Sequence, residues 1–202
     1  MRKFRLQSYE LIFRYMAKVY VFLANGFEDV EALIPVDVLR RGGVEVVTVS
    51  VVDDSQVVES AHRVQMVADT MFADCDFSDA DLLMLPGGMP GASNLNEHEG
   101  VRQALLRQAA AGRRVAAICA APLVLGGLGL LRGKRATCYP GFEQTLEGAT
   151  YTGELCTVDG LVTTGEGPAA AFPFAFSLLS QLVSDDVSHQ VAVGMRYAHL
   201  MA

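Results

Sequence analysis

Short, mainly apolar runs alternate along the chain with longer segments in which apolar residues recur at helical spacing. The apolar runs 18–24, 44–52, 82–85 and 115–118 are typical of buried strands. Helical spacing predicts helices over 28–41, 99–111, 122–128, 170–182 and 186–193. A β-hairpin is predicted over 57–67, with strand-like pieces at 135–138 and 161–164. This alternation predicts an α/β sandwich, with a mostly parallel central sheet and helices on both faces.

Three predicted strands end in residues that can do chemistry. In parallel sheets, functional groups collect at the carboxyl ends of strands. The first strand leads into 25–31, where Gly26 turns the chain and Glu31 lies in the first helical turn. The third strand is followed by the glycine-rich segment 86–88, and the fourth stops at Cys119. We expect these three segments to meet at one edge of the sheet.

Cys119 is predicted to lie at a sharp turn from a buried strand into a helix. Pro122 suits the first turn of that helix, and Ala117, Ala120 and Ala121 leave room for a strained elbow like that of serine hydrolases. A cysteine at a helix N-terminus commonly has a lowered pKa, which predicts a reactive thiolate. The alternative, with about equal weight at this point, is that Cys119 is a small buried apolar residue.

The other two strand ends offer partners for the thiol. Glu31 could hold a proton beside the sulfur, or it could only complement the helix dipole. Backbone N–H groups of 86–88 and of Ala120 could form an oxyanion hole, although a plain turn is also plausible. A phosphate loop is disfavoured because no G-K-[ST] follows, and 126–129 lies within a helical segment rather than in a dinucleotide-binding turn. The four histidines fall outside the predicted strand ends.

Composition narrows the class of protein. The 202 residues are 51% hydrophobic and 19% charged, which favours one domain with a sizeable core. The formal net charge is −7 and there is no long basic run, so we expect no nucleic-acid partner. No apolar run reaches the ~18 residues of a membrane helix. Residues 1–15 lack a signal-peptide core and are expected to be a disordered extension before a domain over 16–202.

Cysteine usage points to a reducing compartment. Cys75, Cys119, Cys138 and Cys156 form no C-x-x-C pair and no zinc-ligand spacing. We therefore expect a cytoplasmic protein without a metal site.

Five segments, read together and in order, resemble a known family. They are 23–31, 34–43, 85–88, 116–122 and 165–168. This set is similar to the ThiJ/PfpI family, and within it to the DJ-one-like branch. The resemblance implies a flavodoxin-like sandwich and a homodimer. It also implies that Cys119 is an oxidisable nucleophile and that Glu31 is a protonated carboxyl hydrogen-bonded to it. Backbone donors map onto Gly88 and Ala120, with Gly87 and Tyr139 as auxiliary residues.

The resemblance implies more than one function. One is cofactor-free, glyoxalase III-like or deglycase-like handling of methylglyoxal or its glycated adducts. The alternative is a non-enzymatic oxidative-stress sensor or chaperone that uses Cys119. An intracellular protease or amidase is a weaker alternative, because such branches place a histidine after the nucleophile and this chain has Ala120.

Two positions depart from the family pattern. Tyr139 stands where glyoxalase-competent members often have a histidine, and a tyrosine with an ordinary pKa of ~10 is a poor base. Glu166 stands where many relatives have arginine or glutamine. The first departure weakens the glyoxalase hypothesis and leaves the redox hypothesis intact.

Overall fold

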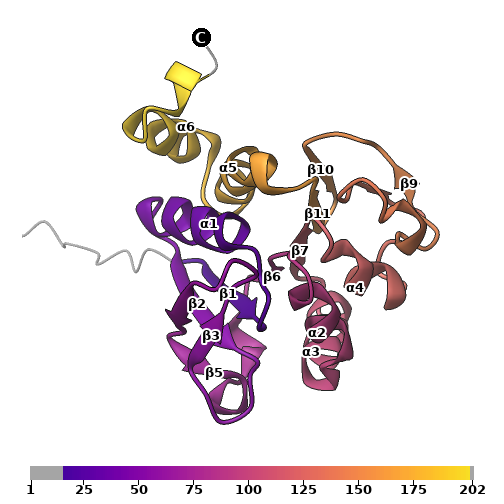
Figure 1. Cartoon of the computed structure of the whole chain (residues 1–202). Coiled ribbons are helices and arrows are strands. Elements are labelled where there is room, and N and C mark those ends of the chain that lie inside the picture. The colour runs from indigo at the N-terminus through magenta and orange to yellow at the C-terminus, as the bar shows by residue number, and fades with distance from the viewer. Residues whose placement is uncertain (1–15, 201–202) are drawn as a thin grey trace, which may run out of the picture.

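The centre of the protein is a sheet with strand order β10–β11–β7–β6–β1–β2–β5 (Figure 1). The structure is a computed structural model that describes residues 16–200. The predicted extension over 1–15 lies outside the described residues. All neighbouring pairs of strands in this sheet are parallel except β10 with β11. The sequence-based prediction of a mostly parallel α/β sandwich is confirmed.

The strand bounds agree with most of the predicted apolar runs. The sheet strands are β1 Lys18–Leu23, β2 Glu45–Ser50, β5 Thr70–Met71, β6 Leu82–Leu85, β7 Arg114–Ile118, β10 Cys156–Asp159 and β11 Val162–Gly165. The predicted hairpin is β3 Val57–Glu59 with β4 Gln65–Val67, which pair antiparallel. A further small ladder joins β8 Arg135–Ala136 to β9 Thr150–Tyr151.

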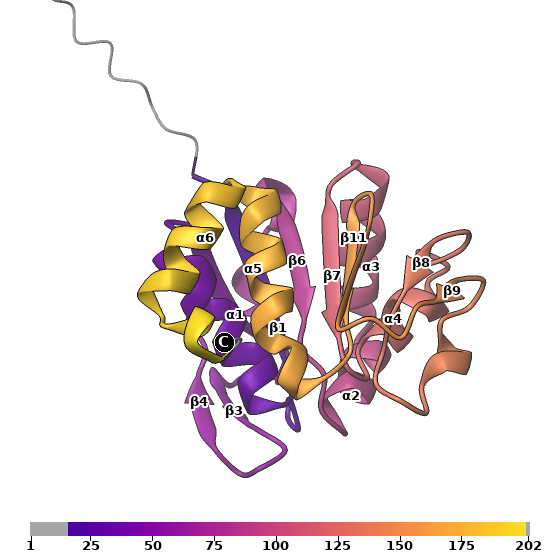
Figure 2. The same ribbon diagram turned by 90° about the horizontal axis from the view of Figure 1, so that it is seen from above.

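The helices form a layer on each face of the sheet. They are α1 Asp29–Arg41, α2 Gly91–Glu97, α3 Glu99–Ala110, α4 Pro122–Gly127, α5 Ala171–Leu182 and α6 Asp185–Gly194. Figures 1 and 2 show α1, α5 and α6 together on one face, and α2, α3 and α4 on the other. Short 3₁₀ turns occur at Phe72–Asp74, Phe77–Asp79, Glu143–Thr145, Pro168–Ala170 and Tyr197–Leu200. None of the helices within residues 16–200 is long and apolar enough to cross a bilayer.

Burial on both faces explains the composition of the central strands. Every residue of β6 is buried, and only Arg114 of β7 is partly exposed. A strand covered by helices on both sides has no solvent-facing side, so its residues are continuously apolar rather than alternating. The small residues Ala116 and Ala117 of β7 also leave space beside the strand end that carries Cys119.

One α-helix and three strands (α2, β5, β9 and β10) were not predicted from the sequence. Helix α2 contains the sequence GASNLNE, which has little helical periodicity, and it begins directly after Pro90. Strands β5, β9 and β10 are short, and they gain their hydrogen bonds by pairing with β2, β8 and β11, respectively. Their formation depends on tertiary pairing rather than on local pattern.

Candidate active site

The register of the sheet brings the three chemically interesting strand ends together. In the parallel ladders, Leu85 of β6 pairs with Ala117 of β7, and Met84 pairs with Val21 of β1. The segments that follow these strands therefore emerge side by side at the carboxyl edge. Glu28 N–H donates to the Gly87 carbonyl at 2.9 Å, which joins the first helix to the glycine segment. The predicted meeting of these segments is confirmed.

Cys119 occupies the strained elbow that the small residues around it predict. Its φ angle is +65°, a left-handed conformation that costs about 1 kcal/mol or more for a residue with a Cβ. The elbow is held on both sides by backbone hydrogen bonds. Cys119 N–H donates to the Gly165 carbonyl at 2.9 Å, and the Cys119 carbonyl accepts from Tyr139 N–H at 2.8 Å. Pro122 lies in the first turn of α4, as predicted.

Glu31 lies buried beside the thiol. The residue lies in the first turn of α1 and is fully buried, with 0% of its surface exposed. Its Oε2 accepts from Gly87 N–H at 3.0 Å, whereas Oε1 is buried and lacks a conventional hydrogen-bond partner among the described residues. Besides Gly87 N–H, the Cys119 thiol interacts with this carboxyl. Glu28 caps the same helix by accepting from Glu31 N–H at 2.9 Å.

The pKa values of the pair are coupled. Burial raises the pKa of the Glu31 carboxyl to about 7. Burial, followed by the negative charge of Glu31, raises the pKa of the Cys119 thiol to about 12. The lowered cysteine pKa predicted from the elbow alone is therefore wrong for the state in which Glu31 is ionised. Two buried acids in contact do not ionise together, so at pH values between these two pKa values the pair carries a single negative charge.

Backbone donors act in favour of the thiolate. The N–H groups of Gly88 and Ala120 interact with the sulfur and lower the pKa of the Cys119 thiol. These are the two residues that the sequence analysis assigned as oxyanion-type donors. With a proton on Glu31, the sulfur has three donors around it and no adjacent negative charge, which is the state in which a thiolate can form.

Gly87 is required because the chain passes very close to the pair. A Cβ built on Gly87 would lie 2.6 Å from the Cys119 Cβ and 2.6 Å from Glu31 Oε2. Gly88 has a φ of +88°, and a Cβ there would lie 2.4 Å from the Glu28 backbone nitrogen. Gly87 and Gly88 therefore bring their N–H groups to the site at a distance that only glycine allows.

Gly87→Ala is expected to reduce the alkylation rate of Cys119 at pH 7.5 by about tenfold or more, because the new methyl group must push carboxyl and thiol apart. The measurement is iodoacetamide labelling followed by mass spectrometry, with circular dichroism to confirm folding. Gly127→Ala is the matched control, since the nearest atom to a Cβ there is at 3.9 Å. An unchanged rate in folded Gly87→Ala would show that the contact between carboxyl and thiol does not control reactivity.

Tyr139 lies at the surface beside the elbow. Its side chain is 46% exposed, and its backbone is bonded to Cys119 as described above. Cys138, its neighbour, is fully buried. The structure thus brings together all the residues that the sequence analysis singled out: Cys119, Glu31, Gly87, Gly88, Ala120 and Tyr139.

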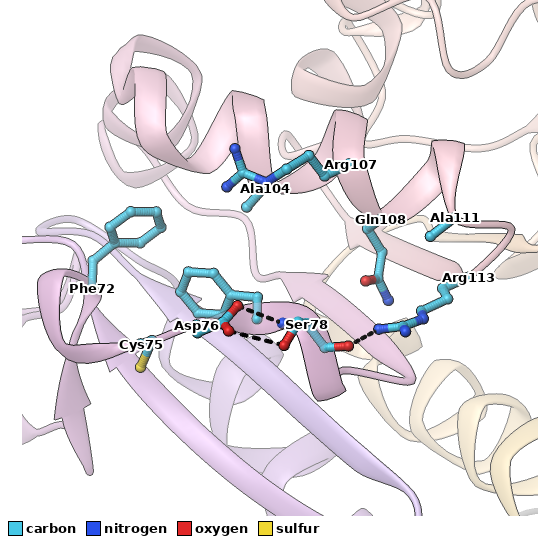
Figure 3. Close-up of a pocket in the computed structure, with 10 residues that line it drawn as sticks. Phe72, Cys75, Asp76, Ser78, Ala104, Arg107, Gln108, Ala111 and Arg113 are labelled. Carbon is cyan, nitrogen blue, oxygen red and sulfur yellow. Dashed lines mark hydrogen bonds between the residues drawn. The ribbon is translucent and has the colours of Figure 1, made fainter.

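A cavity of about 420 Å³ lies away from the residues around Cys119 (Figure 3). It is lined by Phe72, Phe77, Arg107 and Arg113 among others, and Arg113 donates to the Ser78 carbonyl. Its residues precede β6 and β7, so it opens at the amino ends of these strands, opposite to Cys119. The geometry around Cys119, rather than cavity size, marks the candidate active site.

His62 was placed away from the elbow by the sequence analysis, and the structure gives it an acidic partner. Its Nδ1 lies 2.6 Å from Asp29 Oδ2, and these atoms and the Glu28 carboxylate fall within 4.8 Å of one another. Glu28 and Asp29 are already engaged with Glu31 N–H and the imidazole. We assign no metal to this group of side chains.

Comparisons with known proteins agree with the geometry. Residues 17–181 match the model of the DJ-1/PfpI family. The chain is 41% identical over 177 residues to Protein DJ-1 homolog B of Arabidopsis thaliana, covering 87% of this chain and 40% of that protein. It thus spans less than half of that relative. A relative described as an isonitrile hydratase, from Pseudomonas putida, is 36% identical over 143 residues, which are 70% of this chain and 61% of the relative.

Solved structures share the fold. Oxidised DJ-1 of Toxoplasma gondii superposes with a TM-score of 0.86 at 33% identity, covering 90% of this chain and 99% of that one. Sequence match, sheet topology and the elbow with its buried carboxyl all point the same way: the chain belongs to the DJ-1/PfpI family.

Proposed function

We propose that this protein is a cofactor-independent enzyme in which Cys119 attacks a small aldehyde, methylglyoxal or one of its early glycation adducts. The observation that carries the proposal is the contact between a nucleophile on a strained elbow and a buried carboxyl whose pKa is raised to about 7. Such a carboxyl can both give and accept a proton near neutral pH. The relatives named above support the family and leave the reaction open.

The first step uses the form of the pair in which Glu31 holds the proton. The Cys119 thiolate adds to the aldehyde carbon and forms a hemithioacetal, and the oxygen that gains charge takes the proton from Glu31. The N–H groups of Gly88 and Ala120 stabilise negative charge at the sulfur before the attack and at the oxygen during it.

The later steps require the same carboxyl as a base. Ionised Glu31 removes the hydrogen from the former aldehyde carbon and returns a proton to the neighbouring carbon. The hydroxyl proton of the hemithioacetal passes to the former ketone oxygen, and the product is a lactoyl thioester of Cys119. Water then cleaves the thioester, releases lactate and restores the thiol. The sum is methylglyoxal plus water to lactate, so no external oxidant or reductant is needed.

The test is methylglyoxal consumption by the purified protein without glutathione, with lactate quantified as product. We expect one lactate per methylglyoxal consumed over many turnovers. Consumption that stops at about one equivalent per protein, without lactate, would mean that Cys119 only forms an adduct and would contradict the proposal.

A second candidate function is oxidation sensing. Tyr139, beside the elbow, cannot act as the base that a histidine would provide near neutral pH. The hydrogen-bond donors around the sulfur would equally stabilise a cysteine sulfinate. Under mild peroxide, this function predicts selective oxidation of Cys119 over the half-buried Cys75, as measured by mass spectrometry. Equal oxidation of both residues would exclude it. For either function we propose a homodimer in the cytoplasm.

A further inference from the structure

A small pocket adjoins the backbone segments that hold Cys119, and its wall contains the carboxylate of Glu166. Its volume is about 230 Å³, and it is lined by Tyr139, Pro140, Glu166, Gly167, Pro168 and two alanines. Two backbone hydrogen bonds tie it to Cys119: one joins the nucleophile to Gly165, the residue before Glu166, and the other joins it to Tyr139. The pocket thus adjoins the two segments that hold the backbone of Cys119, and we expect the far end of a molecule bound at the sulfur to reach it.

The polar wall of the pocket is acidic. Glu166 is half-buried and Glu143 is exposed. Burial is the main cause of the raised pKa of the Tyr151 phenol, and the negative charges of Glu143 and Glu166 add to it, which places both carboxylates in the same region of the surface. Within residues 16–200, neither carboxylate forms an ion pair. The pocket thus keeps its negative charge.

The aromatic wall is a tyrosine ring held in place by a glycine. A Cβ at Gly167 would lie 3.1 Å from the Tyr139 ring, so the absence of a side chain there lets the ring lie against the 166–168 segment. Tyr139 is 46% exposed, which leaves ring surface for a ligand. An aromatic ring next to a carboxylate is a favourable environment for an ammonium or guanidinium group.

We propose that this pocket selects carbonyl substrates that carry a cationic group, and that Glu166 is the residue that determines this preference. The inference deepens the proposed function and rests on it for the reaction, while the charge preference rests on the pocket alone. Compounds with a carboxylate near the aldehyde, such as glyoxylate, are disfavoured because Glu166 in the pocket wall repels them.

The test measures access to Cys119 with charged thiol reagents, so it does not depend on turnover. The probes are a trimethylammonium-ethyl and a sulfonatoethyl methanethiosulfonate, with neutral methyl methanethiosulfonate as reference. The modification rate of Cys119 is followed by mass spectrometry in the full chain. We expect the cationic reagent to react about fivefold or more faster than the anionic one, after correction for their rates with a free thiol.

Two substitutions assign this preference to Glu166. Glu166→Gln is expected to bring the ratio of cationic to anionic rates towards one, and Glu166→Arg to reverse it. Glu97→Arg is the matched control, because it changes the net charge of the protein by the same amount at an exposed site on α2. A ratio that responds equally to Glu97→Arg and Glu166→Arg would show a general charge effect and would overturn the proposal.

The outcomes separate this inference from the proposed function. A ratio that depends on Glu166, in a protein that forms no lactate, would leave the selective pocket standing and contradict the enzymatic proposal. Lactate formation with a ratio that does not respond to Glu166→Arg would support the enzyme and overturn the inference.

Discussion

Cys119→Ser is expected to abolish lactate formation from methylglyoxal, with a loss of about a thousandfold or more in kcat/KM. A serine hydroxyl needs a strong adjacent base to become a nucleophile, and the group beside it is Glu31. Glu31 can activate the hydroxyl only when ionised, whereas the attack requires its proton. A thiol avoids this conflict, because it can pass its proton to Glu31 and attack as a thiolate.

The substitution is also structurally mild, which makes its result easy to interpret. Serine is smaller than cysteine and can adopt the same left-handed backbone at about the same cost. Cys75→Ser, in the cavity at the opposite edge of the sheet, is the matched control and should retain full activity. Retention of more than about a tenth of the wild-type rate in Cys119→Ser would mean that another group performs the chemistry.

Most of the fold could be predicted from the sequence because buried parallel strands leave a continuous apolar signal. The runs that became β1, β2, β6 and β7 were located within one or two residues. Strand β10 was missed because its sequence, CTVD, alternates apolar and polar residues over only four positions, which is too short a pattern to indicate a strand. Helix α2 was missed because its contacts, rather than its periodicity, make it a helix.

The candidate site could be located from the sequence, but its electrostatics could not. The elbow at Cys119 followed from small residues and a proline, and its φ of +65° agrees with that reasoning. The distance between Cys119 and Glu31 depends on Gly87, whose role is visible only when the chain is folded. The helix dipole alone predicts a lowered thiol pKa. Burial has the largest influence on the pKa of either group, and its extent depends on the folded packing around the pair.

Glu31→Gln is expected to shift the pH dependence of Cys119 alkylation. In the wild type the pair loses its first proton with an apparent pKa of about 7, so reactivity should rise through that pH as the shared-charge state forms. Glutamine can still accept from Gly87 N–H but cannot carry the shared proton. Burial then keeps the pKa of the lone thiol above its ordinary value, so the rise moves to alkaline pH. At pH 7 the rate should fall by about tenfold or more.

The same substitution should stabilise the folded protein at pH 8. The pKa of Glu31 is near 7 in the native state, against 4.5 for a free glutamate, so the native state binds more protons between these values. Stability linked to Glu31 is therefore fully present below about pH 4.5 and is lost as pH rises through about 7. Glu31→Gln removes this loss, which is on the order of 3 kcal/mol at most.

Urea unfolding at pH 5 and pH 8 measures this effect, with Glu97→Gln as an exposed control that should change neither value. For Glu31→Gln, the alkylation rate of Cys119 at neutral pH should fall while the free energy of unfolding at pH 8 rises. Both effects have one cause, because burial of the Glu31 carboxyl destabilises its ionised form and thereby keeps a proton next to the sulfur at neutral pH. A variant that loses both reactivity and stability at pH 8 would show that Glu31 serves only to hold the elbow together. A variant that gains stability and keeps its alkylation profile would show that the thiol ionises without the carboxyl, and the shared-proton mechanism would then be wrong.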